Sequence, residues 1–141
     1  MFAVFRTAAV GAAVAGLLWL PATATATPAT GVSARILAQT RVGGTDYIVR
    51  EITVRPGGST GWHYHDGTLY AVVLSGTLTR TQADCTTTEV SPPGSTLVEA
   101  SAHVHIGRNL GATPVVLVVL YVNPAGSPLA EDAANPGCGF Q

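Results

Sequence analysis

The chain has 141 residues, of which 47% are hydrophobic and 11% are charged. This composition is apolar enough for a folded domain, and the length suits one domain rather than a multidomain enzyme. The formal net charge is -1 at pH 7, and the basic residues, all of them Arg, are scattered along the chain. A nucleic-acid-binding surface needs a cluster of basic residues, so nucleic acid is excluded as an expected partner.

Residues 1–26 have the three-part pattern of a secretory signal peptide. Arg6 precedes an apolar run over residues 8–20, and a string of small residues with an A-x-A cleavage site follows. The apolar run, about 13 residues, is shorter than the ~20 residues that a membrane-spanning helix needs. The sequence therefore predicts cleavage of residues 1–26 and a protein of the extracellular space or cell envelope, with no stable membrane anchor. A buried N-terminal helix or an uncleaved anchor is the alternative.

The remainder of the chain has the pattern of short β-strands separated by turns. Segments rich in Val, Ile, Leu, Thr and Tyr, bounded by Gly and Pro, are 34–42, 46–55, 68–75, 77–81, 86–90, 95–100 and 114–123. No convincing helical periodicity follows residue 26, so the sequence predicts an all-β sandwich or barrel. Ser75 and Gly76 predict a hairpin turn. The almost wholly apolar segment 115–122 predicts a strand that is covered on both faces.

The chain contains two cysteines, Cys85 and Cys138. They are too few for a disulfide framework, and no C-x-x-C pair indicates a zinc ribbon or a redox motif. Outside the reducing cytosol an even number of cysteines favours a bridge. A disulfide between Cys85 and Cys138 would tether the Pro- and Gly-rich tail, residues 126–141, to the body of the protein. Two free thiols are the alternative.

All four histidines lie in two His-x-His pairs, His63 with His65 and His103 with His105. Alternate residues of a strand point to the same face, so each pair would project two imidazoles in one direction. Imidazole is the commonest neutral metal ligand, and histidine sites without cysteine suit Fe, Mn, Ni, Cu or Zn. The pattern predicts a divalent transition metal. The alternative is a set of polar core residues that are hydrogen-bonded to each other and to water.

The segment 58–65, followed by Gly76 at the end of a strand, resembles the first motif of the cupin superfamily. That motif consists of His-x-His, an acid four or five residues later, and a closing glycine. Gly94, His105 and Asn109 have the spacing of the second cupin motif, in which the asparagine is expected to fix a turn.

The resemblance covers residues 57–109 and departs from the second motif where Ala100-Ser101-Ala102 replaces P-x-G. It implies an antiparallel jelly-roll β-barrel over residues 27–125, followed by the tail 126–141. It also implies that His63, His65 and His105 are metal ligands.

The glutamate that completes the cupin metal site is missing, and spacing puts Leu69 in its place. His103 is a candidate for the fourth ligand, because it would share a face with His105 on a regular strand. Otherwise it lies behind the ligands or at the mouth of the barrel, and water completes a three-histidine site. Four other side chains are disfavoured as ligands: Asp66, Tyr70, Glu51 and Glu99, the two glutamates being expected in solvent or in ion pairs with Arg.

The expected function is that of a secreted cupin that binds or transforms a small anionic organic molecule at a divalent metal. As an enzyme it would resemble the dioxygenase, isomerase or decarboxylase cupins. The sequence leaves open whether it is an enzyme, since no acid or base is visible beside the metal and no catalytic residue is assigned. The alternatives are a non-enzymatic, metal-independent barrel that binds a small ligand, and a structural module that pairs as a homodimer.

Overall fold

Ten β-strands and no helix make up residues 26–141, the part of the chain that this computed structural model describes. In chain order they are β1 (Thr30–Val42), β2 (Thr45–Ser59), β3 (His63–Tyr64), β4 (Thr68–Ser75), β5 (Leu78–Gln82), β6 (Thr88–Ser91), β7 (Thr96–Glu99), β8 (His105–Arg108), β9 (Val115–Pro124) and β10 (Glu131–Asp132). Over the same residues no helix is long and apolar enough to cross a membrane. The predicted signal peptide lies outside the described residues except for Ala26, which forms an isolated bridge with Ala134.

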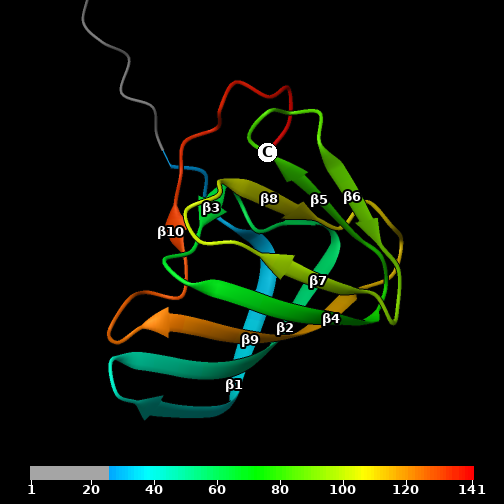
Figure 1. The fold of residues 1–141 in the computed structure, drawn as a ribbon. Helices are drawn as coiled ribbons and strands as arrows, with labels where there is room; N and C mark the ends of the chain where they lie inside the picture. Colours follow the sequence, from blue (N-terminus) through cyan, green and yellow to red (C-terminus); the bar gives the residue numbers. More distant parts are fainter. Residues whose placement is uncertain (1–25) are drawn as a thin grey trace, which may run out of the picture.

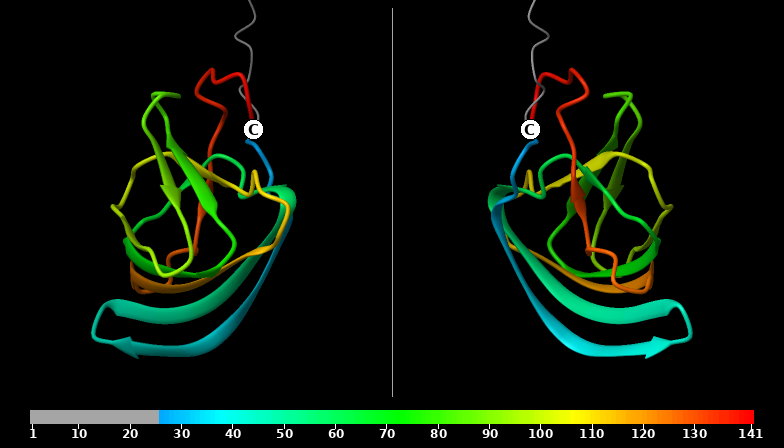
Figure 2. Two further views of the ribbon diagram at one scale, coloured as in Figure 1. Left: turned by 90° about the vertical axis from the view of Figure 1, so that its right-hand side faces the viewer. Right: turned by 90° about the vertical axis from the view of Figure 1, so that its left-hand side faces the viewer.

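All strand pairs are antiparallel, and the sheet curls into a nearly closed barrel (Figures 1 and 2). The main path through the sheet is β10-β3-β8-β2-β9-β4-β7, with β1 added to β2, and β5 between β6 and β8. The long strand β2 pairs with β9 along most of its length and reaches β8 at Ser59, so it belongs to both walls. The structure therefore confirms the all-β class and agrees with a jelly-roll barrel.

The seven predicted strands correspond to β1, β2, β4, β5, β6, β7 and β9, with ends that differ by a few residues. Sequence analysis did not delimit the three short strands β3, β8 and β10. Two of them have two residues and the third has four. Such segments are too short to show an alternating pattern, although β3 and β8 carry two of the histidines.

Ser75 and Gly76 do not form the expected hairpin turn. β4 pairs with β7 and β9, whereas β5 pairs with β6 and β8, so the chain changes walls of the barrel here. Gly76 has a φ of 69°, in the left-handed region that favours glycine. A β-carbon at this position would also lie 2.4 Å from the carbonyl oxygen of Pro114. Glycine at position 76 therefore allows the chain to turn sharply between β4 and β5 while it packs against the loop that contains Pro114.

The main hydrophobic core fills the barrel between β2, β4, β7 and β9. On β9 the buried side chains are Val115, Leu117, Val119 and Tyr121. The alternate side chains, which face outward and are partly exposed, are Val116, Val118, Leu120 and Val122. The expectation that this strand is covered on both faces is therefore wrong for the described chain, in which no element lies over the outer face. Tyr70 and Val98, on the neighbouring strands, are also exposed by 50% and 55%.

A second, smaller core joins the C-terminal tail to the barrel. The expected disulfide links Cys85 to Cys138, with 5.4 Å between the Cα atoms. Trp62 is fully buried beside the bridge and stacks on Phe140, with 6.0 Å between the ring centroids. Strand β10 within the tail pairs with β3. The tail is therefore packed against β3, the strand that carries His63.

Removal of the disulfide should lower the stability of the folded protein. Cys138→Ser is expected to lower the free energy of unfolding by about 2–4 kcal/mol, because the unfolded chain loses a cross-link over a long loop. Urea unfolding under non-reducing conditions measures the change. Cys85→Ser and the double variant should lose the same amount, since each removes the same bond. A loss in the double variant that equals the sum of the two single losses would contradict this account.

Candidate metal centre

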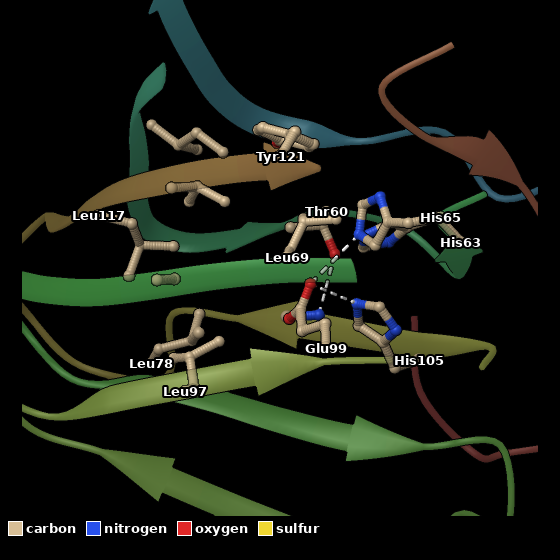
Figure 3. A pocket seen from close by; sticks show the side chains of 14 residues that line it. Thr60, His63, His65, Leu69, Leu78, Leu97, Glu99, His105, Leu117 and Tyr121 are labelled. Carbon is tan, nitrogen blue, oxygen red and sulfur yellow. Dashed lines mark hydrogen bonds and ion pairs between the residues drawn. The ribbon is translucent and has the colours of Figure 1, made fainter. Parts of the chain in front are cut away.

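His63, His65 and His105 converge inside the barrel, as Figure 3 shows. All three are buried, and the ring nitrogens that can act as ligands lie within 4.8 Å of one another. β3 and β8 pair through His63 and His105, and His65 follows directly after β3. The structure thus brings together the three residues that the two cupin-like motifs single out.

The backbone that enters β3 is held by a close contact with the N-terminal segment. Gly61 has a φ of 69°, and a β-carbon there would lie 2.0 Å from the carbonyl oxygen of Thr27. The Trp62 amide donates to the Thr27 hydroxyl at 2.6 Å, and the Gly61 amide donates to the Ser59 hydroxyl at 3.1 Å. Only glycine fits this approach. Gly61 therefore allows the close packing against Thr27 that holds the backbone just before His63.

His103 lies outside the histidine cluster. The expectation that it shares a face with His105 requires a regular strand through both residues, but β8 begins at His105. A turn precedes it, in which Ala102 has a φ of 62°, and the His103 side chain is exposed. Only its backbone takes part in the site, because its carbonyl oxygen contacts the His105 ring.

The three clustered rings are oriented by backbone carbonyls. Each Nδ1 lies at hydrogen-bond distance from a carbonyl oxygen: His63 from Gly61 (3.0 Å), His65 from Leu129 (2.7 Å) and His105 from His103 (2.8 Å). A carbonyl oxygen only accepts, so each Nδ1 carries the hydrogen and each Nε2 of a neutral ring carries a lone pair. This orientation is the usual one for histidines that bind metals through Nε2.

The donor atoms fit a transition metal. The Nε2 atoms of His65 and His105 are buried, and neither has a hydrogen-bond partner among residues 26–141. A buried polar atom without a partner is costly. A divalent cation shared by the three rings would remove that cost, and Fe, Mn, Ni, Cu and Zn all accept imidazole.

A carboxylate, Glu99 on β7, also reaches the cluster. Its Oε2 lies 3.2 Å from Nε2 of His65 and 3.3 Å from Nε2 of His105, while its Oε1 lies 3.3 Å from a guanidinium nitrogen of Arg80. The expectation of an ion pair with Arg is correct, but the expectation of a solvated side chain away from the histidines is wrong. The alternation on β7 contained the signal, because Glu99 lies two residues after the buried Leu97 and shares its face.

Burial and charge determine the protonation of the cluster. Burial is the main cause that lowers the pKa of His63 to about 4, and repulsion from His105 adds to it. Burial raises the pKa of Glu99, but contacts with His105 and His65 lower it more, to well below its ordinary value. At neutral pH the site therefore holds a neutral His63 and an anionic Glu99.

A cavity of about 50 Å³ adjoins the cluster. The histidines, Glu99 and Thr60 line its polar end, and Leu78, Leu97 and Leu117 line the other end, while Leu69 lies next to Glu99 and Thr60 (Figure 3). Leu69 is 2% exposed and packs in the main core. The cavity is small, and most of its lining is apolar.

Sequence reasoning overlooked Tyr121, which lines this cavity, and Arg50, which lies beside Tyr121. The Tyr121 ring centroid lies 5.9 Å from that of His65, and burial raises the pKa of the Tyr121 hydroxyl. The Arg50 guanidinium lies 5.9 Å from the Tyr121 ring centroid. Alternation along the strand was again the signal in the sequence. Tyr121 follows the buried Val119 by two positions on β9, and Arg50 precedes Ile52, which packs against the core, by two positions on β2.

Asn109 fixes a turn, as its motif position implies. It is fully buried, and its amide group donates to the carbonyl oxygens of Val54 (2.9 Å) and Thr113 (2.8 Å). Its side-chain oxygen accepts from the Gly111 amide at 3.0 Å. The residue joins the end of β8 to β2 and takes no part in the histidine cluster.

Comparison with known proteins identifies the fold. A family model described as a cupin domain matches residues 50–121. The polyketide cyclase RemF from Streptomyces resistomycificus is 24% identical over 78% of this chain and 79% of that chain, with a TM-score of 0.63. A cupin-2 domain from Rhodospirillum rubrum is 14% identical over 74% of this chain and 66% of that chain, with a TM-score of 0.61.

A recombinant oxalate oxidase solved in complex with glycolate is 23% identical over 66% of this chain and 51% of that chain, with a TM-score of 0.56. At these identities the solved structures show a common fold. The comparison with curated proteins returned no match.

The pKa of His63 predicts how stability depends on pH in the metal-free protein. The folded state keeps His63 neutral down to about pH 4, whereas the unfolded chain protonates it near pH 6.5. The unfolded state therefore binds more protons between these values. As pH falls across this window, the free energy of unfolding should decrease by about 3 kcal/mol from this group.

Urea unfolding between pH 4 and pH 7, with NMR titration of the His63 ring, measures both quantities. His63→Gln should remove this part of the pH dependence. A His63 ring that titrates near pH 6.5 in the folded protein would contradict the expectation.

Proposed function

Because this chain belongs to the cupin family, we propose that His63, His65 and His105 hold a divalent transition metal to which a small anionic organic molecule binds. The observation that carries the proposal is the convergence of three buried imidazoles whose Nδ1 atoms face backbone carbonyls. Their Nε2 lone pairs then share one small space. Fe, Mn, Ni, Cu and Zn are the candidate metals.

The charges around the cavity support an anionic ligand. Three histidines are neutral ligands, and Arg80 offsets the charge of Glu99, so the positive charge of a divalent ion remains available to a carboxylate or an enolate. Arg50 adds a second cation near Tyr121, and its Nε is buried without a hydrogen-bond partner in the described chain. The oxalate oxidase structure, which contains glycolate, supports a small carboxylate as ligand.

The size of the cavity limits the ligand. About 50 Å³ has room for only a few non-hydrogen atoms next to a metal. When bound, the metal would act as a Lewis acid that polarises an oxygen of the ligand. The leucine-lined end offers an apolar surface to the ligand, and Tyr121, with its raised pKa, keeps its proton at neutral pH. Assays of the metal-loaded protein with small carboxylates distinguish a dioxygenase, isomerase or decarboxylase reaction from binding alone.

We also propose that the protein acts outside the cytosol after removal of residues 1–26. The disulfide between Cys85 and Cys138 supports this location, since such bridges persist in oxidising compartments. The barrel over residues 27–125 would then be the functional unit, with the tail 126–141 attached to it.

Removal of one of the three histidines should lower the affinity of the protein for the metal. Protein prepared without a His-tag should bind about one metal ion per chain, and His63→Ala should weaken binding at least about 100-fold, because the remaining donors leave an incomplete sphere. Elemental analysis and competition with a chelator measure both. His103→Ala is the control and should bind as the wild type does. Wild-type protein without bound or bindable metal would favour a metal-independent ligand-binding barrel.

Because the outer face of the sheet exposes apolar side chains, we expect the protein to form a homodimer through it. Val98 and Tyr70 lie exposed beside the outward side of β9, and a second copy of the chain would cover this apolar surface. Analytical ultracentrifugation should show a dimer that Val98→Arg converts to a monomer with unchanged metal content. Val90→Arg, at an exposed valine of β6, is the control and should stay dimeric. A monomeric wild type would contradict the prediction.

A further inference from the structure

We infer that Glu99 is a fourth, anionic metal ligand, which β7 supplies in place of the glutamate that cupins carry at the position of Leu69. The inference rests on the proposed metal site. It changes the composition of that site from three histidines to three histidines and one carboxylate, and it assigns the carboxylate to a different strand.

The strand register explains how Glu99 can replace the missing residue. Leu69 and Glu99 are direct partners in the antiparallel ladder between β4 and β7. Side chains of directly paired residues point to the same face and lie about 4.5–5.5 Å apart at Cβ. Both side chains line the same cavity. A carboxylate on β7 therefore reaches the space that a carboxylate on β4 would occupy, while Leu69 packs in the core.

The distances fit shared coordination of one ion. The Oε2 atom of Glu99 lies 3.2 Å and 3.3 Å from the Nε2 atoms of His65 and His105. Two ligands that each lie ~2.1 Å from one metal, at angles between octahedral and tetrahedral, are roughly 3.0–3.4 Å apart. The oxygen therefore already has the separation from both rings that a common metal would impose.

The electrostatics of this contact require a cation. Both rings use Nδ1 to donate to carbonyls, so their neutral forms present lone pairs to the carboxylate oxygen. Three electron-rich atoms in a buried space repel each other. A metal ion among them would remove this repulsion and use all three lone pairs.

Arg80 determines which oxygen of Glu99 is available. The Arg80 side chain is 9% exposed and lies between Glu99 and the carboxylate of Glu89. It also donates to the Val98 carbonyl oxygen at 3.1 Å. Arg80 therefore contacts Oε1 of Glu99 and leaves Oε2 for the histidine cluster, which corresponds to a carboxylate that binds through one oxygen.

Substitution of the carboxylate tests the assignment. Glu99→Gln should weaken Mn²⁺ binding at least about 10-fold, because a neutral amide replaces an anionic oxygen ligand. It should also alter the visible absorption of the Co²⁺ form, which reports the ligand set. Chelator competition and absorption spectroscopy measure the two effects, and Glu51→Gln, which removes an acid paired with Arg35 on the outer hairpin, is the matched control.

A Glu99→Gln protein with wild-type Mn²⁺ affinity and an unchanged Co²⁺ spectrum would overturn the inference and leave the three-histidine site intact. A wild-type protein that binds none of Mn²⁺, Co²⁺, Ni²⁺, Cu²⁺ and Zn²⁺ would instead refute the proposed function itself, so the two failures are distinguishable.

A second variant tests the equivalence of the two strand positions. Leu69→Glu combined with Glu99→Leu returns the carboxylate to β4 and keeps one acid and one leucine in the cavity. This double variant should bind Mn²⁺ within about 10-fold of the wild type, and more tightly than the single variant Glu99→Leu. Thermal unfolding checks that each variant is folded. A folded double variant that binds no better than Glu99→Leu would overturn the claim that the positions are equivalent.

Discussion

The central constraint on this protein is the cost of burying electron-rich atoms without a cation. The barrel places an oxygen of Glu99 3.2 Å and 3.3 Å from the Nε2 atoms of His65 and His105, next to a cavity with an apolar, leucine-rich end. Among the described residues, no side chain donates a hydrogen bond to the two nitrogens. A metal ion bound there would supply the positive charge that this arrangement needs.

The orientation of the three rings links distant parts of the chain to the same site. The Gly61 and His103 carbonyls come from turns beside the ligands, whereas the Leu129 carbonyl belongs to the C-terminal tail. The tail is held by the disulfide and by the stack of Trp62 on Phe140. These contacts therefore stabilise the barrel and position His65 at the same time. A small domain has a small core, so few other contacts are available to hold the His65 ring in place.

The cupin fold restricts the chemistry of the site and does not select the reaction. Structures with the same fold include a polyketide cyclase and an oxalate oxidase, so function depends on the groups that line the cavity. In this chain those groups are three imidazoles, one carboxylate that also contacts Arg80, a protonated tyrosine and several leucines. This set favours a small anion at a metal over an extended apolar ligand.

By itself, the sequence determined the strand pattern, the family and the three histidines, because each of these depends on local alternation or on a motif of fixed spacing. It also determined the two cysteines that can pair. Only the tertiary structure decided the rest. Glu99 reaches His65 because β7 pairs with β4, and His103 leaves the cluster because β8 starts two residues later. Both outcomes depend on strand register and on where a turn ends, and these are set by packing between segments that lie far apart along the chain.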